Sequence, residues 1–242
     1  WFAGQEGGTA TARLLLGLAN PGGHTALTWP KYATDTIWGY NETVQLYPGE
    51  PVGPLAAYPN VHLERLNYNY SPGPYPSCVN TALPGTNGQV CTNETEGIFS
   101  GYRFFDKQGI EPQFAFGHGL SYTTFEYRNL VLKAQKDGTM RVSFEVQNKG
   151  KVTGTAVPQV YVGSAPDVPD YVQQAVRALR GFGRVELRPN ETKRVEIVLN
   201  ARSFEYWDER AQAWTFAPGS RTIWVGESSR DLRLSGTAAP EK

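Results

Sequence analysis

The carboxylates that could support acid–base chemistry in this 242-residue chain are Glu6, Glu94 and Glu96. Glu6 stands where a run of helix-forming residues begins, and a helix dipole favours an ionised carboxylate there, which opposes a role as general acid. Glu94 and Glu96 flank Thr95 and would share one face of a strand. Two solvated charges in a loop account for the same spacing, so these carboxylates do not by themselves define an active site.

Histidine, serine and glycine form no complete catalytic pattern in the sequence. His24, His62 and His118 do not stand in metal-ligand spacing, and zinc would need further ligands beside the two cysteines. Residues 117–121 (GHGLS) have no strand-to-helix context and no following lysine, as a phosphate loop would require. A Gly-x-Ser-x-Gly nucleophile elbow is absent from the sequence. We therefore expect neither a bound metal nor a cofactor.

Three tryptophans offer a different kind of site, because aromatic side chains combine a large apolar face with a polar edge. Trp207, Trp214 and Trp224 could together form a platform on which sugar rings stack. Trp224, however, lies inside an apolar strand pattern, so a place in the hydrophobic core explains it better.

The two cysteines, Cys78 and Cys91, lie in a stretch rich in proline, glycine and asparagine that shows neither helical nor strand periodicity. They are either two buried free thiols or a disulfide that closes a short loop. In the chain-entropy model, closing a loop of about 15 residues stabilises a fold by roughly 3 kcal/mol. Because this segment lacks other means of holding its shape, the sequence favours the disulfide.

Four Asn-x-Ser/Thr sequons support an oxidising compartment, since glycosylation and disulfides occur together in secreted proteins. All four stand in turn-like surroundings, and Pro72 weakens the second of them. We therefore expect a secreted, extracellular glycoprotein whose candidate glycosylation sites are Asn41, Asn69, Asn93 and Asn190.

Charge and hydropathy narrow the class of protein. Lys and Arg number 23 and Asp and Glu number 23, so the net charge is zero and no long-range field attracts nucleic acid or an anionic membrane. The longest apolar run lies near residues 14–18, far short of the roughly 20 residues of a membrane span. The chain starts at Trp1 and Phe2 with no signal segment, so we expect a piece of a longer polypeptide.

The expected elements change along the chain. Residues 7–18 predict a helix that stops at 20–23 (NPGG), and residues 25–29 predict a short strand. One helix and one strand cannot bury a core alone, so they belong to a domain whose body lies upstream. The density of proline and glycine in residues 47–88 excludes long helices and central strands, yet the segment is too aromatic for a disordered linker.

Short strands begin near residue 124 and recur every ten to fifteen residues. This pattern is typical of an immunoglobulin-like or fibronectin-like β-sandwich, and it makes the chain mainly β. Residues 140–147 alternate strictly between apolar and polar types, while Val198 and Trp224 have the parity opposite to the inward face. The expected core comprises Val142, Phe144, Val146, Val195, Ile197, Leu199, Ile223 and Val225.

Several parts of the chain resemble glycoside hydrolase family 3. Near the start of the chain, the similarity is to the end of the α/β sandwich domain of that family, and it covers residues 4–17, 20–23 and 28–30 (TWP). The similarity is most specific in two later blocks, 96–107 (EGIFSGYRFFDK) and 114–125 (FAFGHGLSYTTF). Residues 124–238, including 179–182 (LRGF) and 187–189 (LRP), resemble the fibronectin type III-like domain that follows these blocks.

The resemblance covers nearly all of the chain except about 46–92, which looks like a variable insertion. It departs from the family at 24–26 (HTA), where a basic-Leu-Pro step is usual, and at His118, where an aromatic residue is usual. The resulting organisation has three parts: residues 1–45, the tail of an α/β sandwich domain; residues 46–123, an insertion and extended linker on the catalytic body; and residues 124–242, a fibronectin type III-like domain.

The resemblance implies part of a retaining β-glucosidase that removes terminal β-linked glucose through two carboxylates. In the family both catalytic carboxylates lie upstream of the matched residues, so no catalytic residue is expected here and Glu6 matches only a helix start. The expected partners are the upstream barrel and α/β sandwich domains of the same enzyme, with carbohydrate bound mainly upstream and a homodimer left open. The apolar residues expected to be buried against upstream sequence are Trp1, Phe2, Leu14, Leu15 and Leu16.

Two alternatives stand beside this interpretation. The chain could play the same role in a β-xylosidase, because the contacts that choose the sugar would lie mostly upstream. It could instead be a stand-alone carbohydrate-binding or adhesion module that shares only the sandwich. Residues 4–30 discriminate between the classes, since an independent module would not carry part of an enzyme domain.

Overall fold

The computed structural model describes residues 3–36, 50–51, 77–80, 89–92 and 97–241. The chain forms two units, Trp1–Trp29 with Gly101–Lys242 and, separately, Pro30–Ser100. Among the described residues, no helix is both long and apolar enough to cross a membrane.

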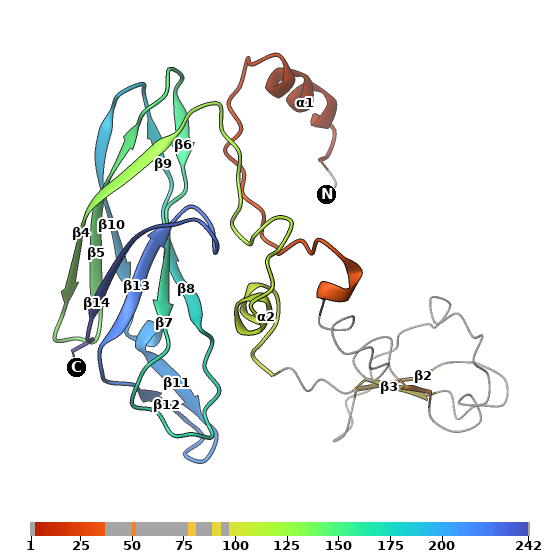
Figure 1. The fold of residues 1–242 in the computed structure, drawn as a ribbon, viewed down its shortest axis with the longest axis vertical. Helices are drawn as coiled ribbons and strands as arrows, with labels where there is room; N and C mark the ends of the chain where they lie inside the picture. The colour runs from red at the N-terminus through yellow and green to blue at the C-terminus, as the bar shows by residue number, and fades with distance from the viewer. Residues whose placement is uncertain (1–2, 37–49, 52–76, 81–88, 93–96, 242) are drawn as a thin grey trace. The chain divides into compact units, whose positions relative to one another are not determined.

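A β-sandwich makes up most of the first unit (Figure 1). One sheet has the order β10-β5-β4, and the other has the order β14-β13-β7-β8. Two further pairs, β6 with β9 and β11 with β12, extend the sandwich. All pairings are antiparallel, and the strands are β4 (Phe125–Ala134), β5 (Met140–Asn148), β6 (Gly154–Ala156), β7 (Gln159–Gly163), β8 (Arg177–Phe182), β9 (Val185–Leu187), β10 (Thr192–Leu199), β11 (Glu205–Asp208), β12 (Ala213–Phe216), β13 (Arg221–Gly226) and β14 (Leu232–Ala238).

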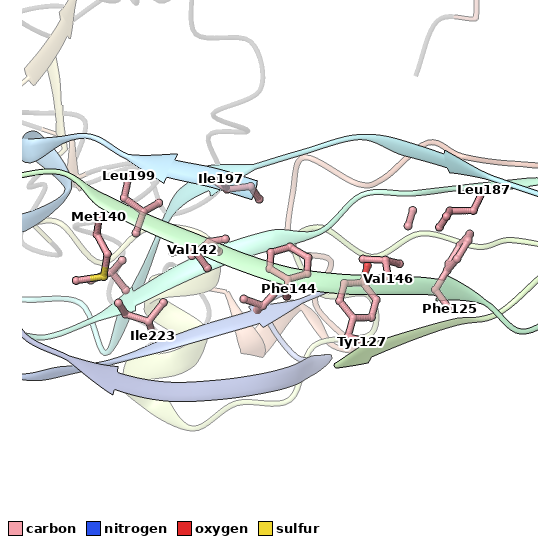
Figure 2. Packing of buried hydrophobic residues seen from close by; sticks show 14 of the residues in the cluster. Phe125, Tyr127, Met140, Val142, Phe144, Val146, Leu187, Ile197, Leu199 and Ile223 are labelled. Carbon is pink, nitrogen blue, oxygen red and sulfur yellow. The ribbon is translucent and has the colours of Figure 1, made fainter. Parts of the chain in front are cut away.

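The core of the sandwich follows from the two-residue period of its strands. Alternate residues of β5 point inward, and these four side chains, Met140, Val142, Phe144 and Val146, are at most 1% exposed. The register of β10 against β5 pairs Ile197 with Val142, so both strands present the same face to the opposite sheet (Figure 2). The predicted register is therefore confirmed.

The burial of the remaining predicted core residues also follows the two-residue alternation of their strands. Leu199, Ile223 and Val225 are fully buried, and Val195 packs partly buried against the same cluster. Val198, of opposite parity, is 55% exposed, while Trp224 is half-buried.

Residues 156–162 form two strands in different sheets, because Pro158 has no N–H to donate and interrupts the ladder between β6 and β7. Two details of the first unit differ from the sequence-based expectation. Residues 25–29 form no strand: isolated bridges pair His24 with Gly119 and Trp29 with Phe114 at the two ends of the segment, and Thr25 makes backbone hydrogen bonds to Gly117 and His118. The first helix, α1 (Gly7–Leu15), also ends earlier than expected.

The second unit contains a short 3₁₀ helix (Ala33–Asp35) and a three-stranded antiparallel sheet with the order β1-β3-β2. Its strands are β1 (Glu50–Pro51), β2 (Ser77–Asn80) and β3 (Gln89–Thr92). The sequence had shown no strand periodicity around the cysteines, so β2 and β3 correct that expectation. The backbone register places Cys78 directly opposite Cys91.

Candidate functional site

The helix α1 leaves a large apolar surface uncovered in the described part of the chain. Leu15 is 79% exposed and Leu16 is 73% exposed, and no residue of α1 is buried. Polar contacts hold the helix to the sandwich unit: the Tyr122 hydroxyl donates to the Leu14 carbonyl (2.7 Å), and the Tyr122 N–H donates to Asn20 Oδ1 (2.8 Å). Apolar surface of this kind is typical of a site where other protein packs.

Glu6 is the residue immediately before α1, and its side chain is exposed and caps no backbone N–H. This position agrees with a helix-start residue. Glu94, Glu96 and His62 lie outside the residues that the structure describes, as do the sequons at Asn41, Asn69 and Asn93. Within the described residues, no group of three His, Cys, Asp or Glu side chains is arranged to hold a metal ion.

The glycine-rich segment 114–119 is a packed connection and does not form an anion cradle. Its carbonyl groups point at neighbouring donors: Gly117 O accepts from His24 Nδ1 (2.5 Å) and from Gln159 Nε2 (3.1 Å), and Phe116 O accepts from the Ser229 N–H (2.9 Å). Gly117 has φ +82°, and a Cβ there would collide with the Gln159 amide. A phosphate site needs converging N–H groups, and this segment presents oxygens instead.

Beside this segment lies a polar cavity of about 290 Å³, lined by residues that include His24, His118, Glu227 and Arg233. Burial raises the pKa of the Glu227 carboxyl, and burial beside that carboxyl raises the pKa of the Tyr127 phenol. Arg233 pairs with Glu227 (3.6 Å) and also binds the Asp231 carboxylate. The carboxylates of Glu227 and Asp231 therefore both pair with the guanidinium of Arg233. This is the geometry of a stabilising ion-pair network and not that of a free general acid and a nucleophile.

A buried ion-pair cluster attaches α2 (Tyr102–Gln108) to the sandwich. The Asp106 side chain is only 1% exposed and accepts two hydrogen bonds from Arg177, each 2.8 Å long. Arg230 also pairs with Asp106, and its Nη2 donates to the Ile110 carbonyl (2.9 Å). Sequence reasoning missed this cluster, because its members lie far apart along the chain.

Aromatic contacts fix the same helix from its other end. The Leu179 N–H of β8 donates to the Tyr102 hydroxyl (2.9 Å). The Tyr102 ring lies 4.9 Å from the Phe116 ring and 6.0 Å from the Tyr161 ring, centroid to centroid. The segment around α2 therefore belongs physically to the sandwich unit, and its function in this chain is architectural.

Of the three tryptophans considered for a platform, the structure brings together the two that were not expected in the core. Trp207 and Trp214 face each other across the β11–β12 hairpin, with ring centroids 5.6 Å apart. Trp224 lies on β13, in the four-stranded sheet, and is no part of this pair. Asn190 is exposed in the turn between β9 and β10, with φ +62°.

Family comparisons agree with this architecture. Residues 1–122 match the family model described as the glycosyl hydrolase family 3 C-terminal domain, and residues 156–229 match the fibronectin type III-like domain. The chain belongs to glycoside hydrolase family 3, and it corresponds to the C-terminal portion of that family.

The curated proteins that are similar to this chain are named as probable β-glucosidases. The probable β-glucosidase M of Neosartorya fischeri is 35% identical over 97% of this chain and 27% of its own length. The probable β-glucosidase D of Aspergillus flavus is 42% identical over 60% of this chain and 21% of its own length. The chain thus spans about a quarter of the length of these relatives.

Solved structures of β-glucosidases are similar in fold to this chain. β-Glucosidase 3B from Thermotoga neapolitana, solved in complex with glucose, is 30% identical with a TM-score of 0.75, over 100% of this chain and 28% of that one. DesR, a β-glucosidase from Streptomyces venezuelae solved in complex with D-glucose, is 30% identical with a TM-score of 0.73, over 99% and 25%.

Proposed function

We propose that this chain is the architectural C-terminal portion of a retaining β-glucosidase that removes terminal β-linked glucose from oligosaccharides or glycosides. The observation that carries the proposal is the similarity to proteins named β-glucosidases over 97–100% of this chain, in both sequence and structure. A stand-alone adhesion module would not share the residues before the sandwich, which match the enzyme family as well.

The chain contributes surfaces and supports rather than the reacting carboxylates. Retaining hydrolysis needs two carboxyl groups about 5–5.5 Å apart. Glu6 is an exposed helix-start residue, and Glu227 and Asp231 are both engaged by Arg233. The two catalytic carboxylates and most of the substrate contacts therefore belong to upstream barrel and α/β sandwich domains, against which the exposed leucines of α1 pack.

The sugar specificity of the complete polypeptide tests this function. We expect its kcat/KM for an aryl β-glucoside to exceed that for the matching aryl β-xyloside at least tenfold, because a glucose site that bonds the 6-hydroxymethyl group loses those bonds with xylose. Parallel assays with the two nitrophenyl glycosides measure the ratio. A ratio in favour of the xyloside would replace the proposal by the β-xylosidase alternative.

We further propose that Cys78 and Cys91 form a disulfide in a secreted, extracellular glycoprotein. Residues opposite each other in an antiparallel pair have Cα atoms about 4.5–5.5 Å apart, within the range of about 4.4–6.8 Å that a disulfide spans. The backbone register of β2 and β3 gives the cysteines this relation. Asn190 supports glycosylation, because its turn is exposed and Thr192 begins β10 on the surface.

Peptide mapping of the natural protein without reduction tests both modifications. We expect one peptide pair linked through Cys78 and Cys91, and a glycan on the Asn190 peptide. Reduction should leave the sandwich folded, because no sandwich strand lies between the two cysteines. Two thiols that alkylate without reduction would refute the disulfide, and an Asn190 peptide of unmodified mass would refute that glycan.

A further inference from the structure

Three aromatic side chains are exposed at one end of the sandwich, two on the β11–β12 hairpin and one on a neighbouring loop. Trp207 is 42% exposed, Trp214 is 50% exposed and Tyr171, from the loop between β7 and β8, is 39% exposed. Tyr171 joins the hairpin through its hydroxyl, which donates to the Asp208 carboxylate (3.1 Å). These three side chains are called the aromatic platform below.

Charged neighbours hold the rings of the aromatic platform in place. The Arg202 guanidinium lies 4.0 Å from the centre of the Trp214 ring, and the Arg210 guanidinium lies 3.9 Å from the centre of the Tyr171 ring. Asp208 Oδ1 also accepts from the Arg210 N–H (2.9 Å), which fixes the hairpin turn. A surface ordered before binding loses less side-chain entropy when a ligand arrives.

This mixture of chemistry suits a carbohydrate. A pyranose presents an apolar C–H face to an aromatic ring and hydroxyl groups at its rim. Arg202 and Arg210 each lie over one face of a ring, so a sugar stacks on the faces they leave open and its hydroxyl groups meet the charged groups beside them. On the proposed function, on which this inference rests, carbohydrate chains surround the enzyme.

The angle between the rings selects the form of the carbohydrate. The planes of Trp207 and Trp214 are inclined by 68°, so the two rings cannot lie flat together on one planar surface. A single soluble chain can stack one residue on one ring and turn toward the next. The geometry therefore excludes the flat face of a crystalline polymer and favours a free oligosaccharide.

The location of the aromatic platform leaves it separate from the attachment of α1. Asn20, in the segment after α1, donates from Nδ2 to the Thr153 carbonyl (2.9 Å), next to β6. In Figure 1 the β11–β12 hairpin lies at the opposite end of the sandwich from β6 and β9. We propose that the aromatic platform is an accessory binding site for a single soluble β-glucan chain, formed by Trp207, Trp214 and Tyr171.

Titration of the 242-residue chain with cellohexaose tests the proposal, with tryptophan fluorescence and calorimetry as readouts. We expect saturable binding that Trp207→Ala and Trp214→Ala each weaken at least tenfold. Trp214→Phe should retain most of the affinity, since it keeps an aromatic face and the cross-strand pair. The matched control is Phe182→Ala, which removes another exposed ring, 70% exposed on β8, and should leave binding unchanged.

Circular dichroism and thermal unfolding of each variant separate lost binding from lost structure. If the alanine variants unfold, oxidation of the wild-type chain still decides, because added cellohexaose should protect Trp207 and Trp214 from the oxidant. Absence of saturable binding, equal affinity in all variants, or binding to microcrystalline cellulose or an aromatic polymer alone would overturn the proposal. Because no turnover is measured, failure here leaves the glucosidase assay as an independent result.

Discussion

Replacing Asp106 by alanine is expected to destabilise the sandwich unit by about 3–5 kcal/mol, since removing one partner of a buried ion pair leaves the other charge uncompensated. Here two guanidinium groups lose a carboxylate, and Arg230 keeps only the exposed Glu111 carboxylate, 3.3 Å away. Arg177 and Arg230 are 16% and 21% exposed, and both converge on the one carboxylate of Asp106. The hydrogen bonds of Leu179 and Ile110 would keep α2 near the sandwich, but they cannot neutralise two guanidinium groups.

Urea unfolding of the 242-residue chain, followed by tryptophan fluorescence, measures this loss. Asp106→Asn should lose less, because the amide oxygen still accepts from Arg177. The matched control is Glu145→Gln, which breaks an exposed pair with Arg128 and should change the stability little, because solvent screens that pair. An Asp106→Ala variant as stable as this control would show that α2 does not contribute to the stability of the sandwich.

The sandwich core could be predicted from sequence because its cause is local. Burial in β5 and β10 follows the two-residue period of a strand. The alternation of apolar and polar residues therefore identifies Val142, Phe144 and Ile197 as inward-facing. The turn at 188–191 likewise follows from Pro189 and Asn190, whose φ of +62° few residues other than Asn and Gly adopt readily.

The Asp106 cluster could not be predicted from sequence, for the opposite reason. Arg177 and Arg230 lie 71 and 124 residues away from Asp106, and no periodic pattern links a carboxylate to a guanidinium over such distances. The same limit applies to Tyr171, which joins the two tryptophans only through the fold. For the cysteines, the sequence suggested the pairing, but the facing strands appear only in the backbone register.

Recombination with the upstream portion should change activity more than any substitution in the chain. Alone, the chain should hydrolyse no aryl β-glucoside, because loss of even one catalytic group typically lowers kcat by orders of magnitude. Mixed with the missing upstream portion, it should restore activity that neither part has alone. The physical reason is burial of α1: fully burying one leucine stabilises an interface by roughly 1.5–3 kcal/mol.

Substitutions in α1 make this expectation specific. Leu15→Glu should raise the concentration of chain needed for half-maximal recovery by about 10- to 100-fold, since about 1.4 kcal/mol corresponds to a factor of ten. Thr9→Glu adds the same charge to an exposed residue on another side of the helix and should have little effect. Glu6→Gln should keep most of the recovered activity, because Glu6 only begins the helix. If Glu6→Gln instead lowers kcat several hundredfold in a folded complex, Glu6 is the acid/base and this chain holds half of the active site.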